Sequence, residues 1–178
     1  MTAKLGITPD QYVEVPLTAE LTPLYENQVQ VVSGFLMDQP VRIANDGYAA
    51  NIIYPDDYGI HFYGDTLWAD EKFIAGNPDL ARRFLRATLK GWIWAVEHPA
   101  EAGALTLKYN PNADPQAKVA KLTASIPLVN TGEDFVGWMK LDVWVGIEQT
   151  LREQGVLTAP LDVTQVYTLQ FLEEIYGK

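Results

Sequence analysis

The sequence predicts an α/β fold whose first third alternates short strands with short helices and whose remainder is mostly helical. Three features lead to this expectation: strand–helix alternation over residues 12–54, a segment rich in turn formers and aromatics over residues 55–69, and helical apolar periodicity from residue 78 onward. Strands that alternate with helices are typical of a parallel sheet with crossover helices. The 178 residues suffice for one domain of ordinary size.

The first third contains three strand-like and two helix-like segments. The run VQVVSGFL is rich in β-branched and aromatic residues, which favour a buried strand. Thr22 precedes a proline at the first position of a helix, and Asn45-Asp46-Gly47 is a typical helix stop. The expected order is strand 12–17, helix 22–27, strand 29–36, helix 39–44 and strand 50–54.

The remaining elements follow from turn residues and from spacing. Pro55–Gly59 has turn chemistry, and the aromatic segment after it leads into one more strand around Trp68. Asn77-Pro78 predicts the start of a long helix, because Leu80, Phe84, Thr88 and Trp92 recur at i+4. The expected helices run from 78 to 98, from 99 to 109, from 114 to about 125 before Pro127, and from 141 to 154, with one or two more within 162–176.

The predicted elements are unevenly distributed: a small α/β part is followed by a helical part with a single strand. A strand around Trp68 needs neighbours, since an unpaired buried strand leaves its backbone groups unsatisfied. Four further tryptophans also need surfaces to pack on: Trp92, Trp94, Trp138 and Trp144. The sequence therefore predicts that the chain begins partway through a larger fold.

Charge and composition exclude several classes of function. The formal net charge is −10, and the best basic cluster lies on one side of a predicted helix, where a solvated face explains it. We therefore expect no nucleic-acid partner. No apolar run has the length of a membrane span, and the N-terminus does not resemble a signal peptide. The cluster comprises Arg82, Arg83, Arg86 and Lys90.

The sequence contains no recognisable catalytic or cofactor-binding motif. There are no cysteines, no phosphate-binding loop and only two histidines. His98 precedes Pro99 at a helix end, where a cation suits the dipole. His61 lies near Asp56 and Asp57, but the spacing matches no metal site, so packing is the preferred interpretation. We therefore expect a non-enzymatic protein without metal or cofactor.

Two turns that follow predicted strands are the candidate ligand contacts. In parallel α/β sheets, ligands lie beyond the carboxyl ends of strands. In the first turn an acidic side chain either caps the next helix or contacts ligand, and the two roles are compatible. In the second, tyrosines either offer stacking faces for a flat heterocycle or pack in a hinge. The residues are Phe35, Met37, Asp38 and Gln39 in the first turn, and Tyr54, Asp57 and Tyr58 in the second.

Three segments carry a resemblance to a known family. They are the turn at residues 34–40, the aromatic stretch at 58–63 with Leu67-Trp68-Ala69, and the long helical segment at 77–92 continued by 95–102. Together they resemble ABC-transporter substrate-binding proteins of the thiamine-pyrimidine-precursor-binding family. That family also includes binders of riboflavin and related aromatic or sulfonate solutes. The similarity covers essentially the whole chain.

The resemblance implies a type II periplasmic-binding fold with two α/β lobes and a ligand between them. Residues 1–54 would be the later part of the second lobe, 55–64 a hinge crossover, and 65–178 the return into the first lobe. It implies capture of a small aromatic or heterocyclic solute, ABC permease subunits as partners, and a periplasmic or extracytoplasmic location. Where the family often has an acidic residue that binds a pyrimidine amine, this chain has Gln39, with Asp38 one residue earlier. Either Asp38 takes over this role and the solute is a thiamine pyrimidine precursor, or the solute is a flavin or another aromatic molecule.

The resemblance also suggests what covers the rest of the fold. Met1 would fall inside the second lobe, so a complementing N-terminal half or a second copy of the chain is an expected partner. The alternative is an interaction protein that binds no solute and oligomerises through its exposed lobe surface. Some relatives are enzymes that make the pyrimidine, but their cysteine-rich motif has no counterpart here.

Overall fold

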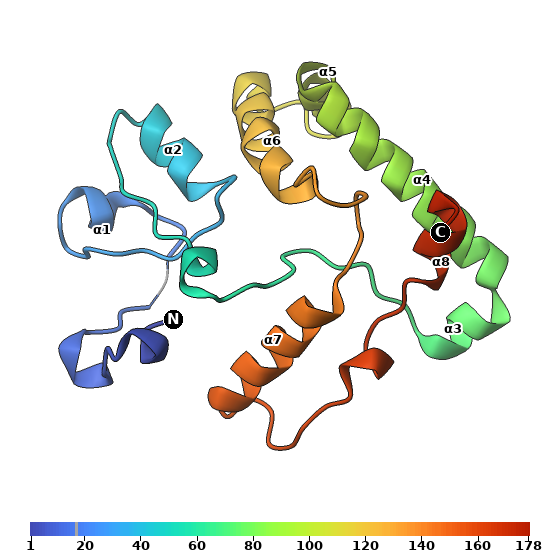
Figure 1. Cartoon of the computed structure of the whole chain (residues 1–178). Helices are drawn as coiled ribbons and strands as arrows, with labels where there is room; N and C mark the ends of the chain where they lie inside the picture. The colour runs from blue at the N-terminus through green and yellow to red at the C-terminus, as the bar shows by residue number, and fades with distance from the viewer. Residues whose placement is uncertain (17) are drawn as a thin grey trace. The chain divides into compact units, whose positions relative to one another are not determined.

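The computed structural model describes residues 1–16 and 18–178, and of Ala3 the backbone only. Within these residues the regular elements are helices (Figure 1). The α-helices are α1 (Thr22–Tyr25), α2 (Gln39–Asn45), α3 (Glu71–Gly76), α4 (Pro78–Glu97), α5 (Pro99–Leu105), α6 (Pro115–Val129), α7 (Leu141–Glu153) and α8 (Gln170–Tyr176). The 3-10 helices are η1 (Ala3–Leu5), η2 (Pro9–Gln11), η3 (Pro55–Tyr58), η4 (Thr106–Lys108) and η5 (Val163–Gln165).

The chain divides into two compact units, each made from two separate stretches. Unit 1 comprises Met1–Ile53 and Trp94–Thr131, and unit 2 comprises Tyr54–Ile93 and Gly132–Lys178. The helix α4 contributes to both, because the division falls between residues 93 and 94. The lobe and hinge boundaries expected at residues 54 and 64 remain predictions.

Unit 1 is built on the pairing of α5 with α6, and α2 also packs against α6. Gly103 makes the first pairing close, since a Cβ placed there would lie 3.1 Å from the backbone nitrogen of Val119. Beside α2, the rings of Tyr25 and Tyr48 stack with centroids 4.0 Å apart. The Tyr25 hydroxyl donates to the Asp46 carboxylate at 2.7 Å and so ties α1 to the end of α2.

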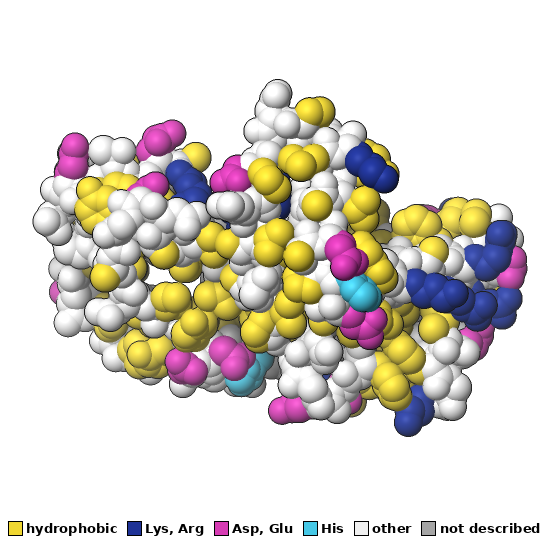
Figure 2. Space-filling model, turned by 90° about the horizontal axis from the view of Figure 1, so that it is seen from above, with side chains coloured by type: hydrophobic (Ala, Val, Ile, Leu, Met, Phe, Trp, Pro, Cys, Tyr) yellow, Lys and Arg dark blue, Asp and Glu magenta, His cyan; other side chains and the backbone are white. Residues whose placement is uncertain are grey.

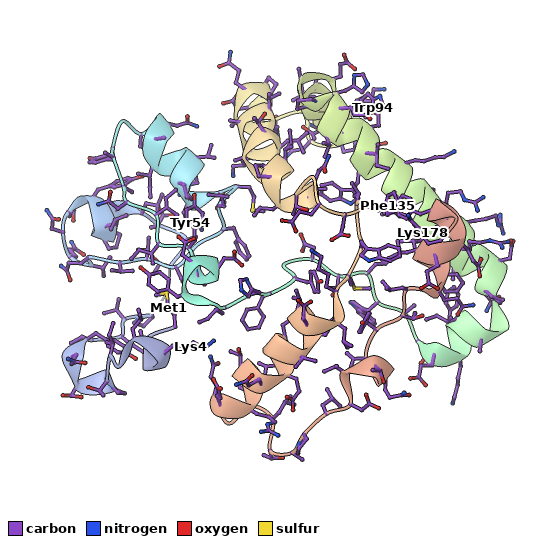
Figure 3. All side chains as sticks on the ribbon, in the orientation of Figure 1. Met1, Lys4, Tyr54, Trp94, Phe135 and Lys178 are labelled. Carbon is purple, nitrogen blue, oxygen red and sulfur yellow. The ribbon has the colours of Figure 1, made fainter. Side chains whose placement is uncertain are left out.

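Unit 2 buries a small apolar cluster and several aromatic rings. Leu89 of α4 is buried, as are Phe171 and Leu172 of α8. A Cβ at Gly137 would lie 3.0 Å from the Leu89 side chain, so the loop before α7 lies directly against α4. The Phe135 ring stacks on Tyr176 at 4.4 Å and lies 5.1 Å from the Lys178 ammonium (Figure 3).

The expected strands do not form in the described residues. Segments 29–36, 50–54 and 66–69 carry no regular secondary structure, and neither do the described residues of 12–17, of which Leu17 lies outside the described part. The physical reason is pairing, because a strand is stable only where a neighbour accepts and donates its ladder hydrogen bonds. The α/β class predicted from alternation is thus not formed here, whereas the helix-rich second part is confirmed.

The chain has a large accessible surface for its mass. Its accessible area is 12,970 Å². A folded monomer of this mass exposes about 8,700 Å², and two separate chains of half the mass expose about 10,500 Å² in total. The segments without strands account for part of the difference, since Val31, Phe35 and Trp68 are more than two-thirds exposed. Figure 2 shows hydrophobic side chains over much of the visible face.

The helices confirm most of the expected boundaries. Asp114 caps α6 by accepting from the Gln116 amide at 2.9 Å, and Gly155 takes a positive φ of 71° just after α7. Three helix ends were wrong. The helix α1 ends at Tyr25 and not at residue 27, and α5 ends at Leu105, where the 3-10 helix η4 takes over, and not at residue 109. The helix α6 runs through Pro127 to Val129 instead of ending before it. Proline removes one hydrogen bond, but in the last turn the loss is small enough for the helix to continue. The helix α3 was not predicted, although Asp70 caps it in the usual way.

Candidate functional site

The first predicted turn is held by the side chain of Gln39. Its Oε1 accepts a hydrogen bond of 2.8 Å from the Phe35 amide. This bond requires the side chain to fold back over Gly34, where a Cβ would lie 2.6 Å from that same oxygen. A glycine at 34 is therefore part of the turn, because any other residue would displace the Gln39 amide.

Asp38, the acidic residue of this turn, is paired with two cations. Lys121 of α6 donates to one carboxylate oxygen, and Arg42 lies 3.9 Å from the other. Asp38 precedes α2 but accepts no capping hydrogen bond from it, so the expected capping role was wrong. The backbone of Asp38, at φ −122° and ψ −78°, lies outside the extended region that N-cap residues adopt, and the carboxylate binds Lys121 instead. The sequence analysis missed Lys121, which lies 83 residues away and carries no local signal.

The second predicted turn is held by its backbone. Residues Pro55–Tyr58 form η3, Gly59 follows with φ 69°, and the Ile60 amide donates to the Pro55 carbonyl at 3.1 Å. Ile60 is buried and anchors the turn. Only a residue that tolerates a positive φ fits after η3, and glycine does so without steric cost.

The aromatic side chains of this second turn stay accessible. Tyr54, which Figure 3 labels, is 40% exposed, and Tyr58 is 41% exposed. Among the described residues neither ring pairs with another aromatic ring, in contrast to Tyr25 or Trp144. Both tyrosines thus keep a face on which a flat ligand could stack. Asp57, between them in the chain, is also exposed.

The predicted site residues belong to two different units. Phe35, Met37, Asp38 and Gln39 are in unit 1, whereas Tyr54, Asp57 and Tyr58 are in unit 2. Within unit 1 the turn brings the Phe35 amide and the Gln39 side chain into contact, while the Phe35 ring itself is 70% exposed. Met37 is half-buried. Their roles toward a ligand remain predictions.

A shallow apolar groove lies on unit 1, away from the predicted residues. It has a volume of about 350 Å³ and follows the contact between α5 and α6. Its walls offer methyl and methylene groups with a single amide, so nothing in it would orient a polar ligand. The lining residues are Ala100, Ala104, Pro115, Gln116, Val119 and Ala120.

Other polar clusters have partners of their own. Arg82 and Arg83 of α4 both bind Asp79, and Arg82 also lies 3.3 Å from Glu174. The Arg82 hydrogen bond, with that of Arg83, lowers the pKa of Asp79. His61 pairs with Asp56.

In the part of the chain that the structure describes, no group of acidic and histidine side chains could hold a metal ion. The described helices include none long and apolar enough to span a bilayer.

Comparison with known proteins identifies relatives over most of the chain. Residues 1–102 match the family model described as NMT1/THI5 like. A riboflavin-binding protein, RibY, of Chloroflexus aurantiacus is 31% identical over 153 residues, which are 83% of this chain and 43% of that protein. A formylaminopyrimidine-binding protein of Halalkalibacterium halodurans is 26% identical over 137 residues, which are 71% of this chain and 42% of that protein.

The chain thus spans less than half the length of these relatives. Both are named as binding proteins, which agrees with the substrate-binding family predicted from residues 34–40, 58–69 and 77–102. The family model covers more than half of the chain, and the resemblance drawn from these motifs is confirmed. The chain belongs to the NMT1/THI5-like family.

Proposed function

We propose that this chain is part of a solute-binding protein that captures a small aromatic or heterocyclic molecule and takes no part in chemical conversion. The observation that carries the proposal is the second turn, where backbone hydrogen bonds position two half-exposed tyrosine rings that pair with no other ring among the described residues. Stacking on such rings suits a flat heterocycle. The names of the relatives, a riboflavin-binding and a formylaminopyrimidine-binding protein, support a solute of this class.

The wider setting of the proposal is import through an ABC transporter. Family membership supports an extracytoplasmic protein with a periplasmic-binding fold that delivers its solute to permease subunits. In such a mechanism two lobes close on the solute, and the closed form presents the surface that the permease recognises.

Titration of riboflavin with flavin fluorescence as the signal tests this function. We expect quenching on addition of the chain, since stacked tyrosines quench flavin emission. Tyr54→Ala and Tyr58→Ala should each weaken binding about tenfold, because an aromatic pair contributes about 0.5–1.5 kcal/mol beyond its buried area. Tyr109→Ala is the matched control, as Tyr109 is 90% exposed in unit 1. Equal affinity of all three variants would contradict the proposed site.

The second candidate function is an interaction protein that binds no solute. The large accessible area and the exposed Trp68 favour it. Light scattering after size-exclusion chromatography separates the two: a stable oligomer that does not quench riboflavin fluorescence would favour the interaction protein, and a quenching monomer would exclude it.

A further inference from the structure

The helix α4 carries apolar residues on two opposite faces. A helix turns about 100° per residue, so positions 80, 84, 87 and 91 share one face, and Leu89 points about 180° away from it. Leu89 is buried in unit 2, whereas Leu80 and Phe84 on the other face are exposed. A Cβ placed at Gly91 would have no atom of another segment within 4 Å, so no described segment covers that end of the face. The exposed apolar stripe comprises Leu80, Phe84, Ala87 and Gly91.

A row of cations borders the apolar stripe along one flank. Arg83, Arg86 and Lys90 are exposed and point within about 60° of one another on the helix. Residues 78–91 hold four basic residues and one acidic residue, and so have a net charge of +3 in a chain whose net charge is −10. The acidic residue, Asp79, pairs with Arg83, whereas Arg86 and Lys90 make no ion pair with a described residue. This flank is therefore locally positive.

The combination of stripe and flank is more than a solvated helix face. Solvation accounts for the cations, but it does not account for exposed leucine and phenylalanine side chains beside them. The helix α4 is strongly amphipathic, although its average hydrophobicity is low. Helices of this kind lie in the plane of a bilayer surface, where the apolar stripe enters the boundary between headgroups and acyl chains and the cations meet anionic lipids.

We propose that this face of α4 docks on an anionic phospholipid surface, with Leu80 and Phe84 inserted at headgroup level and the cations of the flank against lipid phosphates. The negative net charge of the chain does not prevent the contact, because at physiological ionic strength charges more than about 8 Å away are screened. A fluid lipid surface accommodates exposed apolar side chains without the preformed pocket that a protein partner would have to supply. The contact uses neither candidate turn and therefore goes beyond solute binding.

Co-sedimentation of the chain with large unilamellar vesicles tests the proposal. One set of vesicles contains phosphatidylglycerol and phosphatidylcholine in equal parts, and the other contains phosphatidylcholine alone. We expect the wild-type chain to bind the anionic vesicles about 25-fold more tightly, since each of the two cations without an ion pair contributes about fivefold near an anionic surface. Salt at about 1 M, where the screening length falls to about 3 Å, should abolish this preference.

Substitutions in the flank test the electrostatic part of the contact. Arg86→Gln combined with Lys90→Gln should lower the affinity for the anionic vesicles about 25-fold and leave binding to phosphatidylcholine unchanged. The matched control is Lys108→Gln combined with Lys118→Gln, which removes the same charge from unit 1 and should leave both affinities unchanged.

A substitution in the stripe tests the apolar part. Phe84→Ala should lower the affinity for the anionic vesicles about tenfold, because the ring, 58% exposed in the free chain, no longer leaves water on docking. Tyr109→Ala, at an aromatic residue that is 90% exposed in unit 1, is the control and should bind as the wild type does.

The proposal is overturned if the chain binds neither set of vesicles, binds both equally, or keeps its affinity without the two cations. A chain that ignores vesicles but forms a dimer, which Phe84→Ala dissociates in light scattering, would assign the stripe to a second copy of the chain instead. Riboflavin quenching measured on the same samples reports solute binding separately, so a chain that quenches but does not sediment keeps the solute site and loses the lipid contact. Circular dichroism shows whether each variant is folded, and if one unfolds, the salt dependence of the wild-type chain decides.

Discussion

The two predicted turns are held in place by different kinds of interaction. The turn at 34–39 is held by side chains, through the Gln39 oxygen and the ion pair of Asp38 with Lys121. The turn at 54–60 is held by backbone, through the positive φ of Gly59 and the bond from Ile60 to Pro55. Polar side chains that build a turn have part of their hydrogen-bonding capacity occupied. A turn built from backbone leaves its side chains available, and Tyr54 and Tyr58 are accordingly exposed.

The largest effect on this comparison should come from Gly59→Val. A β-branched residue at φ 69° is strained, so the free energy of unfolding should fall by about 2 kcal/mol. Urea denaturation measures the change. Gly64→Val, at a glycine with open space and no positive φ, is the control. Equal stability of the two variants would show that the backbone does not hold the second turn.

A smaller effect is expected from Lys121→Met, which removes the stronger partner of Asp38. The two side chains are 32% and 31% exposed, so solvent screens the pair and the loss should be about 1 kcal/mol. Lys118→Met on the same helix is the matched control, since Lys118 makes no ion pair with a described residue. Both variants are compared by urea denaturation. If the free energy of unfolding falls as much in the Lys118 variant as in the Lys121 variant, the ion pair with Asp38 does not stabilise the first turn.

The smallest effect is the pH dependence of stability that Tyr25 contributes in unit 1. Desolvation, together with the hydrogen bond to Asp46, raises the pKa of Tyr25 from 10.0 to about 12. A raised pKa means that the neutral form stabilises the fold below about pH 10, and that this stabilisation is lost as pH rises through 12. Burial also raises the pKa of Tyr176, so absorbance at 295 nm should show a late tyrosine titration that Tyr25→Phe reduces in amplitude. An unchanged amplitude in that variant would assign the late titration to other tyrosines.

Local chemistry made most helices predictable from sequence. Asp114-Pro115 starts α6 and Gly155 ends the turn after α7, because caps act within a few residues. The strands could not be predicted reliably in this way. Residues 29–36 have strand composition, but a strand also needs a paired neighbour, and composition contains no information about the neighbour.

The two turns could be located from the sequence, whereas the role of their residues toward a ligand stays a prediction. Turn formers and aromatic residues point to Asp38, Gln39 and Tyr58. The pairing of Asp38 with Lys121 depends on α2 packing against α6, which no local pattern encodes. The contact of Gln39 with Phe35 spans only four residues, yet it depends on the missing side chain of Gly34, whose effect is visible only in three dimensions.

The close approach of α5 and α6 also constrains how the sequence can vary. Because a side chain at position 103 would meet Val119, the sizes of these two residues are tied to each other. Among relatives that keep this helix pair, an alanine at the position of Gly103 should occur together with a smaller residue at the position of Val119. The two positions should therefore covary, although they lie 16 positions apart in the chain.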